Sequence, residues 1–259
     1  MKPKALILTG YGINCDYETA AAFQLPAVGG EAERVHLNDL ITRPVLLHRY
    51  QILVLPGGFS FGDDIASGKV LANRLRYRLS EALTTFLEAG KLILGICNGF
   101  QVLIKMGLLP EPTFVQQATI TFNDSGRFED RWVYLKVHPN PSPFLRGIEH
   151  LYLPVRHGEG KFIPRDATVC TRLWQQQQVC LQYVDPEGKV AGYPWNPNGS
   201  VDNIAGICDP SGRIFGLMPH PEAYLVPTNH PRWTREKIPA EGMGVQIFRN
   251  AVNYVRENL

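Results

Sequence analysis

Short apolar runs alternate with amphipathic stretches along the first half of the chain. The apolar runs are typical of strands buried on both faces of a sheet, and the stretches between them repeat apolar residues at helical spacing. This alternation predicts a parallel sheet wrapped by helices. The expected strands are Ala5–Leu8, Val35–Leu37, Leu53–Leu55 and Leu92–Ile96, and the expected helices run over Asp16–Ala22, over 65–89 and up to Gly107.

The pattern changes after Pro112. Two runs, Gln117–Phe122 and Trp132–Val137, alternate like strands and predict an antiparallel addition in the second half of the chain. A last helix is expected over Val245–Val255, and the polar run Gln175–Gln178 is expected in an exposed loop or edge. The fold class is therefore α/β, with an open, mainly parallel sheet flanked by helices, in one domain over residues 1–259. We assign no role to segments 140–150, 170–180 and 225–240.

Candidate chemistry begins where the strand Leu92–Ile96 ends. The strand continues directly into Gly95-Ile-Cys97-Asn-Gly99 and then into a helical pattern. A strand, a sharp turn with a nucleophile and a helix together form a nucleophile elbow, in which the glycines leave room for the turn. The helix N-terminus would favour the thiolate of Cys97. A buried structural cysteine would fit the same residues, so the motif alone favours catalysis only modestly.

A second strand-like run, Ile214–Leu217, ends in Met218-Pro-His220-Pro-Glu222. Pro221 restricts the backbone of the residue before it. In an extended segment, the side chains of His220 and Glu222 point to the same side, and their Cα atoms lie about 6.5 Å apart. The carboxylate then orients the imidazole so that its other nitrogen faces a nucleophile, as in a catalytic triad. A turn with solvated side chains is the alternative. The carboxyl ends of parallel strands gather at one edge of a sheet, which favours a shared site with Cys97.

A third strand, Gln51–Leu55, ends in Pro56-Gly57-Gly58. Adjacent glycines can turn backbone N–H groups toward a ligand. We therefore expect the amides of Gly58 and Asn98 to hold a developing oxyanion, although the same glycines also fit an ordinary loop. The following pair Asp63 and Asp64 is expected to cap the next helix rather than to bind a metal.

Composition argues against several other classes of protein. The net charge of +2 over 259 residues gives no reason to expect nucleic-acid binding. The five cysteines are widely spaced and lack the CxxC pattern, which indicates reduced thiols in a cytoplasmic protein rather than disulfides or zinc. The apolar N-terminal run is too short for a signal peptide, and no segment approaches the ~20 apolar residues of a membrane span.

Two nucleotide-binding patterns are incomplete. In Gly10–Cys15, a cysteine stands where a dinucleotide-binding fingerprint needs its third glycine. In Gly62–Lys69, the glycines have the wrong spacing for a phosphate-binding loop, and Val70 replaces the Ser or Thr that holds magnesium. We therefore expect no cofactor in this chain.

The ordered motifs around Gly58, Cys97 and His220 resemble the class I (triad-type) glutamine amidotransferase domain. Within it, nearly the whole chain is similar to the glutaminase subunits of phosphoribosylformylglycinamidine synthases. The strings that carry this narrower resemblance are Gly12–Asp16, Gly57–Asp63, Asn98, Asn123–Glu129, Pro154–Gly160, Tyr193–Ser200 and Met218–Glu222.

The resemblance implies a mechanism and partners. Cys97 would attack L-glutamine, His220 would transfer protons and Glu222 would orient His220. Gln101, His157 and Gly158 would bind the amino-acid end of the substrate. The ammonia would pass to a separate synthetase subunit, which would carry ATP and magnesium, with a small accessory subunit beside it. This family makes formylglycinamidine ribonucleotide for purine biosynthesis.

Two other interpretations stay open. The same triad would serve a free-standing hydrolase or an amidotransferase of another pathway. Only Asn98 and the Tyr193–Ser200 string argue against these two functions. The second interpretation is a docking subunit whose triad no longer functions. The presence of all three triad residues makes this a weak alternative.

Overall fold

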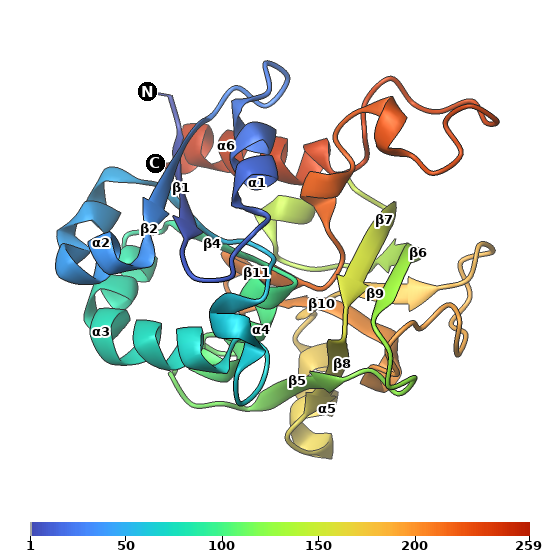
Figure 1. The fold of residues 1–259 in the computed structure, drawn as a ribbon, viewed down its shortest axis with the longest axis horizontal. Coiled ribbons are helices and arrows are strands. Elements are labelled where there is room, and N and C mark those ends of the chain that lie inside the picture. Colours follow the sequence, from blue (N-terminus) through green and yellow to red (C-terminus); the bar gives the residue numbers. More distant parts are fainter. Residues whose placement is uncertain (1) are drawn as a thin grey trace.

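A nine-stranded sheet forms the centre of the molecule (Figure 1). The computed structural model describes residues 2–259. The strand order is β2-β1-β3-β4-β11-β10-β9-β6-β7, and β5 and β8 form a separate antiparallel pair. The strands are β1 (Lys4–Thr9), β2 (Glu31–His36), β3 (Ile52–Leu55), β4 (Leu92–Ile96), β5 (Ala118–Phe122), β6 (Glu129–Val137), β7 (His150–His157), β8 (Glu159–Pro164), β9 (Val179–Val184), β10 (Ile204–Cys208) and β11 (Ile214–Leu217).

Helices cover both faces of the parallel half of the sheet. Helices α1 and α6 pack together on one face, and α2, α3 and α4 lie on the other (Figure 1). The α-helices are α1 (Asp16–Gln24), α2 (Leu37–Thr42), α3 (Lys69–Glu88), α4 (Asn98–Met106), α5 (Ala167–Gln175) and α6 (Val245–Asn258). Short 3₁₀ helices are η1 (Pro44–Arg49), η2 (Ser60–Asp63), η3 (Pro143–Leu145), η4 (Val201–Asn203), η5 (Pro221–Ala223) and η6 (Pro227–Asn229). None of the helices described combines the length and apolar character needed to cross a membrane.

The predicted fold class is confirmed. Strands β2, β1, β3, β4 and β11 pair in parallel, whereas β10, β9, β6 and β7 extend the sheet in antiparallel pairs. Every residue of β3, β4 and β11 is buried, as their continuous apolar sequences require. Because β3, β4 and β11 are parallel neighbours, their carboxyl ends lie at the same edge of the sheet.

Several element boundaries differ from the prediction. The second strand is β2, four residues earlier than expected, and Leu37 begins α2 instead of ending the strand. The sequence of β2 is rich in charged residues, and Val35 is its only buried residue. The apolar pattern was therefore too weak to predict the full length of this edge strand. Helix α1 begins at Asp16, but Cys15 holds the cap position and the Asp16 carboxylate pairs with Arg34 at 2.8 Å.

One local prediction was wrong and a second was only partly right. Asp63 and Asp64 do not cap the third helix: α3 begins at Lys69 with Gly68 at its cap, and Asp63 ends the separate turn η2. The run Gln175–Gln178 is not wholly exposed, because Gln178 is fully buried and its Nε2 donates to the carbonyls of Pro110 and Cys208 at 2.7 and 2.9 Å. A buried amide with partners for its hydrogens has no sequence signature.

Close packing of α4 against the sheet depends on glycine. A Cβ at Gly99 would overlap the carbonyl of Leu55 in β3, and a Cβ at Gly216 in β11 would overlap the ring of Phe100. At Gly95, a Cβ would lie 2.5 Å from Leu103 Cδ1 and 2.8 Å from the backbone of Gly99. The helix therefore lies closer to the strands than any side chain at these positions would permit.

We expect Gly99→Ala to destabilise the protein by about 1–3 kcal/mol, because the obstructing carbonyl belongs to a central strand that cannot move alone. Gly192→Ala is the matched control, since no atom lies within 4 Å of its added Cβ, and its effect should stay within about 0.5 kcal/mol. Denaturant unfolding of both variants measures the difference. Equal losses in the two would contradict the packing argument.

Candidate active site

Three strand ends bring the predicted site residues together. Gly58 follows β3, Cys97 follows β4 and His220 follows β11, all at the same edge of the sheet. The backbone N–H of His220 also donates to the carbonyl of Pro154 at 2.8 Å, which fixes the loop after β11 against β7. Side chains from distant parts of the sequence therefore share one cavity.

Cys97 occupies a strained turn between β4 and α4. Its φ of 49° and ψ of −104° lie in a region that residues with a side chain rarely adopt. The turn is held on both sides, since the Cys97 N–H donates to Leu217 at 2.8 Å and its carbonyl accepts from Gln101 at 3.0 Å. Helix α4 begins at the next residue, so the thiol lies at a helix N-terminus. This is the geometry of a nucleophile elbow.

His220 and Glu222 form a buried pair with 2 % and 3 % of their surfaces exposed. His220 Nδ1 and Glu222 Oε1 lie 2.6 Å apart. The predicted contact is present, but the predicted extended segment is wrong: Pro221 begins the turn η5, so the carboxylate curls back toward the ring. His220 Nε2 has no hydrogen-bond partner among the described residues. That nitrogen is therefore free for a proton transfer.

The pKa of His220 results from opposing effects. Burial lowers the pKa, but the charges of Glu222 and Cys97 and the neighbouring thiols of Cys15 and Cys97 outweigh burial and raise it well above its usual range. An imidazole in this setting readily accepts the thiol proton of a nearby cysteine.

Of the two predicted oxyanion donors, Gly58 lines the same cavity as Cys97, and Asn98 directly follows Cys97 in the chain. Gly58 has a φ of 149°, and a Cβ there would lie 2.6 Å from the carbonyl oxygen of Gly12, so only glycine fits. Asn98 is the first residue of α4, where an amide N–H has no partner within the helix. The Asn98 side chain accepts from Ser60 N–H at 3.3 Å and donates to Gln101 Oε1 at 2.9 Å, which ties η2 to α4.

Gln101, His157 and Gly158 line a cavity of about 320 Å³ that also contains Cys97 and Gly58. Their polar groups are largely engaged within the protein. Gln101 Nε2 donates to the Glu159 carbonyl at 2.5 Å, and the Gly158 carbonyl accepts from Asn123 N–H at 2.9 Å. These residues shape the cavity that contains the thiol.

His157 is held neutral inside this wall. Its Nδ1 lies 3.1 Å from Asn123 Oδ1, and burial, followed by the charge of His220, lowers its pKa to about 3. The ring thus has a fixed hydrogen-bond partner and little tendency to carry charge.

The sequence interpretation missed Cys15 as a neighbour of the triad. Cys15 lines a cavity of about 220 Å³ with Cys97 and His220, and a Cβ on Gly57 would contact both its Sγ and the His220 ring. Ligand-type atoms of Cys15, His220 and Glu222 lie within 4.8 Å of one another, and the 2.6 Å hydrogen bond joins His220 Nδ1 to Glu222 Oε1 within this group. Burial raises the pKa of the Cys15 thiol. The string Gly12–Asp16 was the available signal, since it is one of the matched motifs.

Three charged or polar residues were also missed in the cavity wall. Asp63 and Glu159 line the 320 Å³ cavity, and Lys105 lies behind it, 3.8 Å from Glu159 Oε2. Lys105 is only 4 % exposed, although the sequence shows it as one lysine on an apolar helix. Contacts between segments this far apart cannot be read from local pattern.

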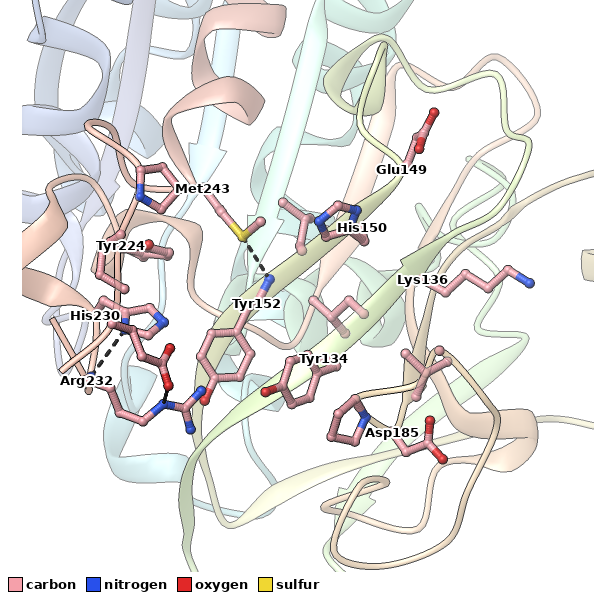
Figure 2. Close-up of a pocket in the computed structure, with 18 of the residues that line it drawn as sticks. Tyr134, Lys136, Glu149, His150, Tyr152, Asp185, Tyr224, His230, Arg232 and Met243 are labelled. Carbon is pink, nitrogen blue, oxygen red and sulfur yellow. Dashed lines mark hydrogen bonds and ion pairs between the residues drawn. The ribbon is translucent and has the colours of Figure 1, made fainter.

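A larger cavity, of about 520 Å³, lies over β6 and β7 beneath the segment 225–240 (Figure 2). The rings of Tyr134 and Tyr152 lie 4.5 Å apart there, and Arg232 pairs with Glu236 at 2.5 Å. No cysteine or serine is among the described residues that line it. The candidate nucleophile Cys97 lines the cavities at the strand ends instead.

The chain is similar to known proteins over nearly its whole length. Residues 2–255 match the family of CobB/CobQ-like glutamine amidotransferase domains. The chain is 48 % identical to phosphoribosylformylglycinamidine synthase subunit PurQ of Dehalococcoides mccartyi, over 99 % of both chains. It is 44 % identical to the subunit of that name in Methanococcus maripaludis, over 97 % of both. Its structure resembles a chain of PurLQS from Thermotoga maritima with a TM-score of 0.74 and 33 % identity, covering 98 % of this chain and 100 % of the other.

The low pKa of His157 predicts a pH dependence of stability. Because the folded-state pKa of about 3 lies below the unfolded value, the stabilising contribution is complete above pH 6.5 and is lost as the pH falls from there toward 3. Wild type should therefore lose its advantage over His157→Gln by roughly 1.4 kcal/mol per pH unit between pH 6 and pH 4. Urea unfolding of both proteins measures this. An advantage that stays constant over that interval would contradict a neutral buried His157.

Proposed function

The chain belongs to the CobB/CobQ-like glutamine amidotransferase family and, within it, to the PurQ subunits, and from this premise we propose that it is the glutaminase subunit of a phosphoribosylformylglycinamidine synthase. It hydrolyses L-glutamine and supplies ammonia for the conversion of formylglycinamide ribonucleotide to the amidine in purine biosynthesis. The observation that carries the proposal is the shared cavity of Cys97 and His220, with the 2.6 Å contact from His220 to Glu222 behind it.

The proposed reaction has two halves. Cys97 Sγ attacks the side-chain amide carbon of glutamine, and His220 takes the thiol proton and passes it to the departing ammonia. Water then attacks the γ-glutamyl thioester with His220 as base, which releases glutamate and restores the thiol. The amides of Gly58 and Asn98 would stabilise each tetrahedral oxyanion, at about 3 kcal/mol per donor. Glu222 keeps the imidazole in the orientation that both halves need.

The ATP-dependent step belongs to another polypeptide in this proposal. The two incomplete nucleotide patterns support that assignment, as does the name of the Thermotoga maritima complex, PurLQS, which indicates three kinds of subunit. ATP and magnesium would be held by the synthetase subunit, and a small accessory subunit would complete the assembly. We propose that the complex works in the cytoplasm, which fits the five free cysteines.

An exposed aromatic rim supports docking over the cavity mouth. Phe59, Phe122 and Phe128 all line the 320 Å³ cavity, yet they are 43 %, 71 % and 53 % exposed. Apolar groups gathered around a functional cavity are typical of surfaces that a partner covers. A partner there would also exclude water and limit the loss of ammonia.

A glutamine analogue with a diazo-ketone in place of the amide should modify Cys97 and spare Cys15, because only Cys97 lies in the strained elbow at the start of α4. The Cys15→Ala variant should keep the label and Cys97→Ala should lose it, as peptide mass mapping would show. Label on Cys15 in the wild-type protein would contradict the assignment of the nucleophile.

In the assembled complex, Cys97→Ala should lower glutamine-dependent synthesis at least about a thousandfold, because the covalent step has no other nucleophile. Synthesis from added ammonium salt should remain near the wild-type rate, since the synthetase site is untouched. Amidine formation from each nitrogen source measures both. Loss of both activities in an intact complex would mean that Cys97 acts outside glutamine hydrolysis.

A further inference from the structure

We propose that Asp63 receives the α-ammonium group of glutamine and so distinguishes this amino acid from other primary amides. The inference rests on the proposed glutaminase function. Asp63 lines the 320 Å³ cavity that contains Cys97, although it lies 34 residues earlier in the chain. Three saturated carbons separate the amide of glutamine from its ammonium group, so the group that receives the ammonium must lie within this short distance of the nucleophile.

Only two carboxylates are among the described residues that line this cavity, Asp63 and Glu159. Glu159 is already compensated: its two oxygens accept from Ser67 N–H at 3.1 and 3.3 Å, and Lys105 Nζ lies 3.8 Å away. Lys105 also donates to the Ser67 carbonyl. These buried groups form a satisfied network that holds the loop before α3 against α4 and β8.

Asp63 has hydrogen bonds with Ser67 and Gly68 but no ion pair of its own. Within residues 2–259 no cationic side chain lies within 4.0 Å of it, and its contact with Asn98 Nδ2 is long, at 3.4 Å. Burial raises the pKa of Asp63, and the charge of Glu159 raises it further, whereas hydrogen bonds with Ser67 and Gly68 and the charge of Lys105 lower it. The net shift is upward, so a cation beside the carboxylate would be favourable. The ammonium group of the substrate supplies that cation.

The position of Asp63 is set by the backbone rather than by the side chain. Asp63 has a φ of 55° and the preceding Phe61 a φ of 56°, so the turn η2 holds two non-glycine residues in the left-handed region. The Asn98 Oδ1 contact with Ser60 N–H ties this turn to the residue after the nucleophile. The distance between the carboxylate and the thiol is therefore fixed before substrate binds, which is what recognition of one chain length needs.

The test compares glutamine with 4-carbamoylbutanoate, which lacks only the α-amino group, as substrates of the complete complex. Asp63→Asn should raise KM for glutamine about ten- to hundredfold, the range expected for loss of a charge-assisted hydrogen bond, and change kcat little. Its KM for 4-carbamoylbutanoate should equal that of wild type. The adjacent, exposed Asp64 is the matched control, and Asp64→Asn should keep wild-type values for both substrates.

Iodoacetamide, which has no amino-acid end, checks the geometry of the site. It should alkylate Cys97 at the same rate in Asp63→Asn and in wild type. Slower alkylation, or a kcat that falls equally with both substrates, would show that Asp63 acts through the architecture of the loop and would overturn the proposal. An unchanged preference for glutamine in Asp63→Asn would overturn it as well. Failure of the wild-type complex to hydrolyse glutamine would instead overturn the proposed function.

Discussion

The close approach of α4 to the parallel strands is the constraint on which the site depends. Gly99 lies against the carbonyl of Leu55, and Gly216 lies against the ring of Phe100, so helix and strands meet without intervening side chains. This contact forces the chain to leave β4 and enter α4 within one residue, Cys97, whose φ of 49° is the consequence. The strain at Cys97 is therefore maintained by packing energy distributed over the core, together with the backbone hydrogen bonds of Cys97 with Leu217 and Gln101. The thiol is thereby presented at a helix N-terminus.

Around this turn, the protein separates charges that react from charges that hold the structure. Glu159 and Lys105 are buried beside each other and satisfied by Ser67, so they fix the loop after β3. His157 is kept neutral by burial with Asn123 as its partner. The remaining groups, His220 Nε2 and the Asp63 carboxylate, have capacity for a further partner. The same low-polarity surroundings that make satisfied networks rigid make these two groups responsive to a ligand.

The parts of the fold and site that follow from local pattern were predictable. Continuous apolar strands, the glycines around Cys97 and the order of the motifs led to the parallel sheet, to the elbow and to the contact of His220 with Glu222. What could not be predicted depends on contacts between distant segments. Cys15 lies close to His220 because Gly57 has no side chain to separate the two residues. Lys105 is buried beside Glu159, which belongs to the distant strand β8. The cap at Gly68 escaped prediction because Asp63 and Asp64 offered better capping side chains nearer the expected start.

The two sides of the cavity differ in how firmly they are held. The thiol, the imidazole and the loop before α3 are fixed by core packing and buried hydrogen bonds, so the strand-end edge is rigid. The outer wall consists of Phe59, Phe122 and Phe128, which have exposed rings and few polar anchors. Apolar rings that remain in water gain free energy when another surface covers them. A partner that docks there would therefore close the cavity on the side where its wall consists of exposed rings. Binding of the partner would then be coupled to the retention of ammonia.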